Sequence, residues 1–183
     1  MSLKNSEHNF GMVSRANHWI SAIIFISLIG VGIFMTGLED GDQKNAMYAL
    51  HKSMGVAIFG LMLLRLLWLK ISPNPEQISA SKFEHILGHA VKGILYLAML
   101  GMPLSGWIMS NSGGHEVAFF EFFVLPAIVG ESEMIHEIAE VLHGSFGLLL
   151  IAVVLLHVAG ALKHHFVLKD ATLLRMLGRN KEQ

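Results

Sequence analysis

The chain has 183 residues, of which 53% are hydrophobic, a mean hydropathy of +0.55 and a formal net charge of −1. These values indicate a membrane protein and exclude an ordinary soluble domain. The absence of cysteine excludes disulfides, iron–sulfur clusters and thiolate-ligated haem or zinc, so that histidine, with eleven copies, is the strong metal ligand that remains.

Four stretches approach the length of about 20 mainly apolar residues that a membrane-spanning helix needs. They lie roughly at residues 18–38, 50–69, 86–109 and 138–162. Pro73 and Pro75 lie between the second and third stretches and end any helix there. A further apolar segment, 117–129, is too short to span the bilayer and is expected at its interface. We expect one all-α domain over residues 1–183, an integral membrane four-helix bundle.

Lysine and arginine gather on one side of the four predicted spans. With an even number of spans, both termini lie on the same side as the middle loop, and that side holds every lysine and arginine except Lys44 and Lys52. The excess of positive charge on cytoplasmic loops places both termini in the cytoplasm. The outer loops are rich in aspartate and glutamate, so we expect an acidic outer face. The expected surroundings are membrane lipid, and no nucleic-acid partner is expected.

Four histidines lie at matching depths in the predicted spans, where an ionisable side chain is costly and indicates function. His18 opens the first span at its inner boundary, and His51 opens the second at its outer boundary. The fourth span carries His143 near its outer end and His157 near its inner end. Their separation of 14 residues corresponds to about 21 Å, with both side chains within about 40° of one helix face. His143 can therefore meet His51, and His157 can meet His18.

Two histidines from opposing helices are what a six-coordinate, low-spin haem requires, because the axial ligands approach the iron from both faces of the porphyrin. The sequence therefore predicts two b-type haems enclosed by the bundle, with these histidines as ligands of the haem iron. The inner pair is His18 with His157, and the outer pair is His51 with His143. Iron held in this way changes oxidation state without binding a substrate, and no catalytic residue is assigned.

Residues beside the proposed ligands suit a bound macrocycle. Arg15 and Lys52 are candidates to pair with the haem propionates at the two surfaces, or else they anchor helix ends. Small residues near the ligands leave room between helices, although they also pack membrane helices together without any cofactor. These glycines are Gly55, Gly144, Gly147 and Gly160.

Other histidines leave alternatives open. A membrane histidine often only bonds one helix to another. His136 precedes His143 by seven residues on nearly the same helix face and is the second candidate for that ligand. His85 and His89 lie one turn apart, a spacing that suits a metal or a quinone pocket as well as interfacial anchoring.

Short motifs containing histidine, tryptophan and arginine are spread along almost the whole chain. They are RANHW at 15–19, HKSMG at 51–55, RLLW at 65–68, HILGH at 85–89, HHF at 164–166 and KDATLLRM at 169–176. Together they resemble the bacterial cytochrome b561 family, whose members are small di-haem cytochromes of the bacterial inner membrane. The resemblance implies the same four ligands, His18, His51, His143 and His157.

The resemblance also implies a function. It implies electron transfer across or within the inner membrane, to or from ubiquinone as substrate and partner, and an oxidoreductase that oxidises superoxide at the periplasmic face in some members. An acidic outer face would repel superoxide and suits a cationic redox protein as donor, although Lys44 and Lys52 offer a positive entrance.

Two further functions are compatible with the sequence. One is a haem-carrying membrane anchor subunit of a larger dehydrogenase. The other is a histidine-based metal transporter, which would need ligands converging at one depth with carboxylates nearby. Aspartate and glutamate are scarce within the four spans, and this argues against the transporter.

Overall fold

The structure is a computed structural model that describes residues 2–78 and 81–179. Within these residues, four long helices are each long and apolar enough to cross a membrane. The predicted all-α bundle of four membrane helices is therefore confirmed. The helices are α1 (Met12–Thr36), α2 (Asp42–Ile71), α3 (Lys82–Ser112) and α4 (Glu133–Phe166), followed by the short α5 (Thr172–Leu177).

The helices are longer at their polar ends than the apolar stretches predict. α2 begins at Asp42 and α4 at Glu133, each well before its apolar stretch. Side chains fix two of these starts, because Ser81 accepts a hydrogen bond from the Glu84 amide and Ser132 accepts one from the Ile135 amide. Continuing the helix also satisfies backbone groups that lie close to the hydrocarbon.

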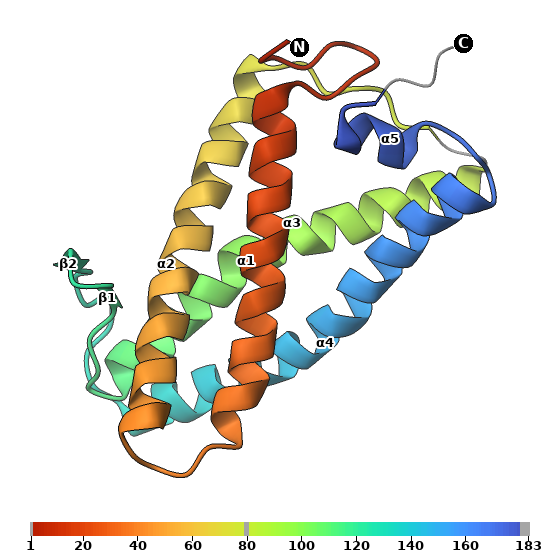
Figure 1. Cartoon of the computed structure of the whole chain (residues 1–183). Coiled ribbons are helices and arrows are strands. Elements are labelled where there is room, and N and C mark those ends of the chain that lie inside the picture. The colour runs from red at the N-terminus through yellow and green to blue at the C-terminus, as the bar shows by residue number, and fades with distance from the viewer. Residues whose placement is uncertain (1, 79–80, 180–183) are drawn as a thin grey trace.

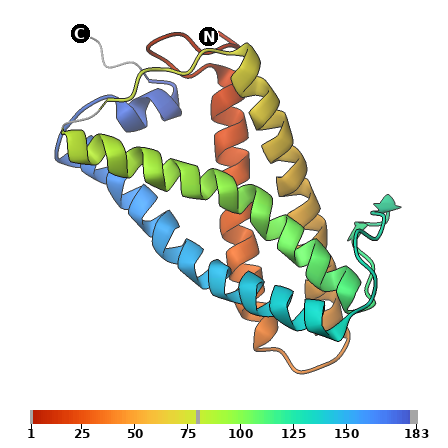
Figure 2. The same cartoon turned by 180° about the vertical axis from the view of Figure 1, so that it is seen from behind.

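The helices pack as two pairs. α1 packs along α2, α3 packs along α4, and α2 also contacts α3 (Figures 1 and 2). In the described residues, α4 has no comparable backbone packing against α1 or α2. The start of α1, the end of α4 and α5 lie at one end of the bundle, here called the inner end, and the α1–α2 loop lies at the opposite, outer end.

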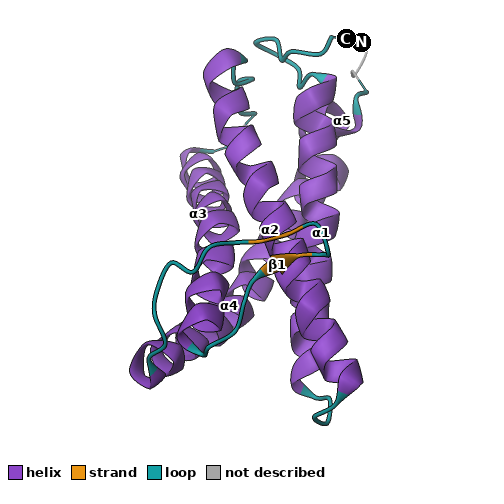
Figure 3. Cartoon of the chain, turned by 90° about the vertical axis from the view of Figure 1, so that its left-hand side faces the viewer, coloured by secondary structure: helices purple, strands orange, loops and turns teal. Residues whose placement is uncertain are grey.

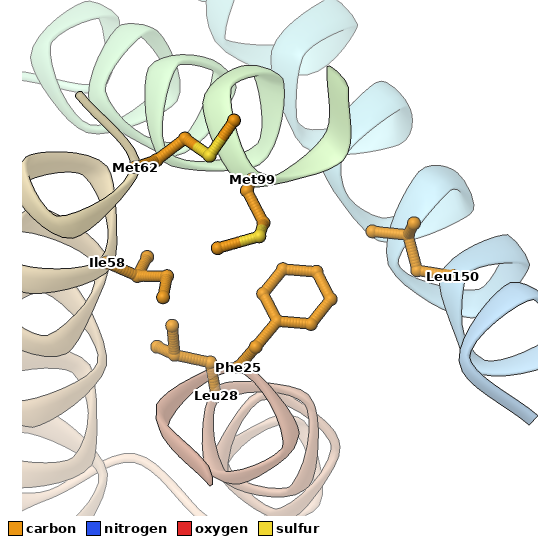
Figure 4. Close-up of a cluster of buried hydrophobic side chains, with 6 residues drawn as sticks. All are labelled: Phe25, Leu28, Ile58, Met62, Met99 and Leu150. Atoms are coloured by element: carbon orange, nitrogen blue, oxygen red, sulfur yellow. The ribbon is translucent and has the colours of Figure 1, made fainter. Parts of the chain in front are cut away.

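A small apolar core holds the four helices together at mid-depth (Figure 4). Ile58 and Met62 of α2 are fully buried in it. Most other large apolar side chains are exposed, as expected of a surface that faces lipid. The core consists of Phe25, Leu28, Ile58, Met62, Met99 and Leu150.

The connection between α3 and α4 forms a short hairpin that lies beside α2 (Figure 3). Its antiparallel strands are β1 (Ala118–Phe119) and β2 (Phe123–Val124). Ser53 of α2 fixes it, because its hydroxyl oxygen accepts a hydrogen bond from the Phe120 amide at 2.8 Å and donates one to the Ala118 carbonyl at 3.2 Å. The apolar segment 117–129 therefore contains a hairpin anchored to the second helix.

Candidate functional site

The inner end of the bundle brings together one predicted pair of histidines. His18 comes from α1 and His157 from α4, and the centroids of their rings are 6.2 Å apart with an angle of 54° between the ring planes. Both side chains are partly buried. The two rings thus face each other across helices whose backbones do not pack closely together.

The outer half brings together the second predicted pair. His51 comes from α2 and His143 from α4, with ring centroids also 6.2 Å apart and ring planes at 77°. The ring that faces His51 is that of His143, whereas the Nδ1 atom of His136 lies 2.8 Å from the Met109 carbonyl. His136, the second candidate for the outer ligand, is therefore hydrogen-bonded to α3.

The ring separation fits one iron between each pair. A metal–imidazole bond of about 2 Å, added to the distance of about 1.1 Å from a ring nitrogen to the ring centre, places two opposing imidazole centroids about 6 Å apart. The observed 6.2 Å is the same in both pairs and is too long for a direct hydrogen bond between the two rings. The residues present therefore fit two bis-histidine haems.

The apolar core lies between the two pairs because each helix repeats after seven residues, or two turns. His18 is followed by Phe25 on α1, and Leu150 lies midway between His143 and His157 on α4. Similarly, Ile58 follows His51 by seven residues on α2. An apolar layer about two helical turns from each pair thus separates the two pairs.

α3 orients the ring of His143. The Ser105 hydroxyl donates to the Met102 carbonyl at 2.9 Å, and its oxygen lies 2.9 Å from Nδ1 of His143. A hydroxyl has a single proton, and that of Ser105 is donated to the Met102 carbonyl. In the contact between Ser105 and His143, the Nδ1–H group of His143 must therefore be the donor and the Ser105 oxygen the acceptor. This tautomer leaves a lone pair on Nε2 of His143, which is the form that binds a metal.

The ring of His51 is held differently. Its Nδ1 is buried and has no hydrogen-bond partner among the described residues. Buried polar atoms are nearly always bonded, so this orphaned nitrogen is consistent with a site that takes a further group. Nothing in the sequence signals this asymmetry between His51 and His143.

Glycines that contact the histidine rings come from the neighbouring helices. A Cβ atom at Gly32 of α1 would lie 3.4 Å from Cε1 of His51, and one at Gly106 of α3 would lie 3.2 Å from Cε1 of His143. The glycines predicted from sequence lie elsewhere: a Cβ would meet nothing within 4 Å at Gly55, Gly144 or Gly160, and only a Met102 methyl group at Gly147. Those positions border open space, and Gly32 and Gly106 were missed because they lie on other helices.

The two predicted propionate partners are engaged with the protein. Lys52 donates a hydrogen bond to the Glu116 carbonyl at 3.0 Å and so ties α2 to the hairpin connection. The guanidinium of Arg15 packs closely against Gly178, the residue just after α5. A Cβ atom at position 178 would overlap this guanidinium. Their role toward propionates stays a prediction.

Arg65 and Tyr96 are the residues near the inner pair that sequence reasoning missed. Arg65 of α2 donates from Nε to the Tyr96 hydroxyl at 3.0 Å, and its guanidinium carbon lies 5.1 Å from the centre of the Tyr96 ring. Its charge acts on both His18 and His157. The available signal was a charged residue inside the predicted span 50–69, which the sequence shows only as part of the positive charge and of the RLLW motif at 65–68.

The remaining histidines do not assemble a metal site. His85 and His89 have ring centroids 4.4 Å apart with ring planes tilted by 45°, and both side chains are exposed. Among the described residues, no group of three or more histidine, aspartate or glutamate side chains is placed to hold a metal ion. The structure therefore offers two facing pairs of histidines, each suited to bind one iron from both sides.

A membrane bundle with facing histidine pairs has the architecture of an electron-transfer membrane cytochrome. The chain belongs to the prokaryotic cytochrome b561 family, whose model matches residues 9–179. The resemblance found in the sequence is thereby confirmed. The family establishes a multi-pass membrane protein of a prokaryotic type that carries electrons and has b-type haem as its cofactor.

Relatives of similar length match nearly the whole chain. Cytochrome b561 homolog 2 of Escherichia coli strain K12 is 34% identical over 183 residues, covering 98% of this chain and 97% of the relative. Cytochrome b561 homolog 1 of the same strain is 28% identical and covers 90% and 94%. A probable superoxide oxidase, CybB, of Yersinia pestis is 27% identical and covers 90% and 93%.

Proposed function

We propose that this protein binds two b-type haems, an inner one through His18 and His157 and an outer one through His51 and His143, and passes electrons between them across the inner membrane. The observation that carries the proposal is the common ring separation of 6.2 Å in the two pairs. Each haem, when bound, would supply an iron that takes up and releases one electron, and the two histidines of its pair would hold that iron.

The chain contributes positions and surroundings to this transfer. α4 provides one ligand to each site, at a separation of about 21 Å along its axis, so a single rigid helix fixes the spacing of the two sites. Ser105 and Gly106 hold the ring of His143, and the apolar core separates the two pairs. Arg15 and Lys52, next to the ligands in sequence, are proposed to meet the propionates once these are bound.

The proposed membrane partner is ubiquinone, reached from the lipid, with both termini in the cytoplasm as the distribution of lysine and arginine indicates. The proposed donor at the outer face is a cationic redox protein, because that face is acidic. Glu131 and Glu133, with His115 and His136, line an open outer groove of about 470 Å³. A negative groove attracts a cationic donor and slows the approach of an anion.

Oxidation of superoxide with reduction of quinone is the second candidate function. The relative CybB is described as a probable superoxide oxidase, and this favours it. The acidic outer groove opposes it, since steering of an anion needs positive charge at the entrance.

The test is a dithionite-reduced minus oxidised visible spectrum of the detergent-purified protein, with a pyridine haemochrome count of haem per chain. We expect a sharp b-type alpha band and two haems per chain. His18→Ala or His157→Ala should lose the inner haem, and His51→Ala or His143→Ala the outer one, leaving one haem per chain. A colourless protein would refute the proposal, and a variant that keeps both haems would remove its histidine from the ligand set.

A further inference from the structure

Arg65 carries a positive charge inside a membrane-spanning helix. It follows His51 by 14 residues on α2, so it lies about 21 Å nearer the inner end and on nearly the same helix face. A charged side chain within a membrane-spanning helix costs free energy, and such residues usually have a polar partner and a functional role. Its position puts it at the depth of the inner histidine pair.

Tyr96 of α3 holds the guanidinium in place without neutralising it. The Nε–H group donates to the Tyr96 hydroxyl at 3.0 Å, and the cation lies 5.1 Å from the centre of the same ring. The ion pairs found among the described residues include Lys44 with Asp40, Lys163 with Glu84 and His164 with Asp170, and none of these three involves Arg65.

Arg65 lies at the depth of the inner histidine pair, about 21 Å along α2 from the depth of the outer pair. Arg65 acts electrostatically on both His18 and His157, and Lys92 adds to its effect on His157. Lys52, the cation next to His51 in the chain, is tied to the Glu116 carbonyl. Arg65 therefore adds positive charge to the surroundings of the inner pair.

We infer that Arg65 raises the reduction potential of the inner site above that of the outer site and so directs electrons from the outer end to the inner end. Reduction of either site removes one unit of positive charge, and a nearby fixed cation favours that change. The inference rests on the proposed function, because it needs one redox centre at each pair. It adds a direction, inward, to the proposed transfer.

The experiment is a potentiometric titration of the detergent-purified holoprotein, followed at the haem alpha band, for the native chain and for Arg65→Gln. In Arg65→Gln we expect the midpoint potential of the higher-potential haem to fall by about 59 mV for one electron. At a fixed ambient potential, the ratio of its reduced to its oxidised form then drops about tenfold. In Arg65→Lys the midpoint potential of this haem should stay close to the native value, because the positive charge remains. Lys70→Gln, which removes an exposed cation from the same helix, should leave both components within about twofold.

Single-haem variants assign the shift. In a His51→Ala background, which retains only the inner haem, Arg65→Gln should still lower the midpoint potential. In a His18→Ala background, which retains only the outer haem, Arg65→Gln should leave the midpoint potential unchanged. Two haems per chain with no shift, or a shift confined to the outer haem, would overturn the inference while leaving the di-haem proposal intact. A haem count below two in the native chain would instead refute the proposed function.

A measurement that leaves Arg65 intact keeps the inference testable should Arg65→Gln fail to fold. The potential of the haem left in His51→Ala should exceed that of the haem left in His18→Ala. An equal or reversed order would contradict the inward direction.

Discussion

At the scale of single residues, the two histidines of the outer pair differ in how their rings are fixed. His143 is bonded to Ser105, whereas Nδ1 of His51 has no partner among the described residues. A hydrogen bond to the second ring nitrogen sets the tautomer and the orientation of a metal-binding histidine. Ser105 therefore positions the ring of His143, and under the proposed function it would act through that ring and not by touching the iron.

Replacing Ser105 by alanine tests this role. Ser105→Ala removes the acceptor for Nδ1–H of His143, and loss of such a partner typically weakens metal binding by about 10- to 100-fold. We expect the purified variant to hold less outer haem, with the inner haem and the helical circular dichroism unchanged. The measurement is haem titration of the depleted protein, with Ser105→Thr, which restores the hydroxyl, as the matched control. Equal haem affinity in all three proteins would show that Ser105 does not position the ligand.

At the scale of elements, α5 closes the inner end beside His18. The indole of Trp19, next to His18, donates to the Met176 carbonyl at 3.0 Å, and the Arg175 side chain donates to the Glu76 carbonyl at 2.9 Å. Asp170 lies just before the helix, where its carboxylate accepts a hydrogen bond from the Thr172 amide at 2.8 Å and lies 2.5 Å from Nδ1 of His164. A six-residue helix is too short to be stable alone, so these contacts hold it.

Acidification should release α5. Burial alone would raise the pKa of Asp170, but hydrogen bonds from His164 and Thr172 outweigh it and hold the pKa below the usual aspartate range. A lowered carboxyl pKa stabilises the docked element above the pKa of the undocked form, about 3.9, and this stabilisation is lost as the pH falls through the docked value.

We therefore expect hydrogen exchange of the α5 amides to accelerate, relative to those of α4, as the pH falls below about 4, after correction for the intrinsic rate. In Asp170→Asn the exchange should already be fast at neutral pH and should show no such acid step. The idea fails if native α5 and Asp170→Asn α5 exchange alike across the whole range.

At the scale of the whole molecule, charge divides the bundle into two unlike ends. The inner end carries most of the lysine and arginine, and the outer end carries the groove lined by Glu131 and Glu133. Electrostatic steering depends on charge complementarity and is screened by salt, with a Debye length of about 10 Å at 0.1 M. The way in which the rate of haem reduction changes with salt concentration therefore indicates the sign of the charge on an electron donor that reacts at the outer face.

Stopped-flow reduction over a range of salt concentrations separates the two proposed donors. Reduction by superoxide should become faster as salt rises, because screening weakens repulsion by the acidic groove, whereas reduction by a cationic protein should become slower. Neutralising the groove with Glu131→Gln and Glu133→Gln together should flatten both dependences. A superoxide rate that falls with salt would contradict this account and indicate a positive entrance.

Hydropathy and length alone determined the four helices and the depth of each histidine. A span needs about 20 apolar residues and a helix rises 1.5 Å per residue, so the depths of His18, His51, His143 and His157 follow from their positions in the chain. The predicted pairs are the ones that face each other. Pro73 and Pro75 likewise lie just after the end of α2 at Ile71.

Only the tertiary structure decided what surrounds each pair. The contacts of Ser105 with His143 and of Arg65 with Tyr96, and the bond that takes Lys52 to the Glu116 carbonyl, all join different elements. They depend on how far each helix is rotated about its axis and which helix packs beside it. Hydropathy leaves that rotation open, because lipid solvates every face of an apolar helix equally well, and packing between helices selects it.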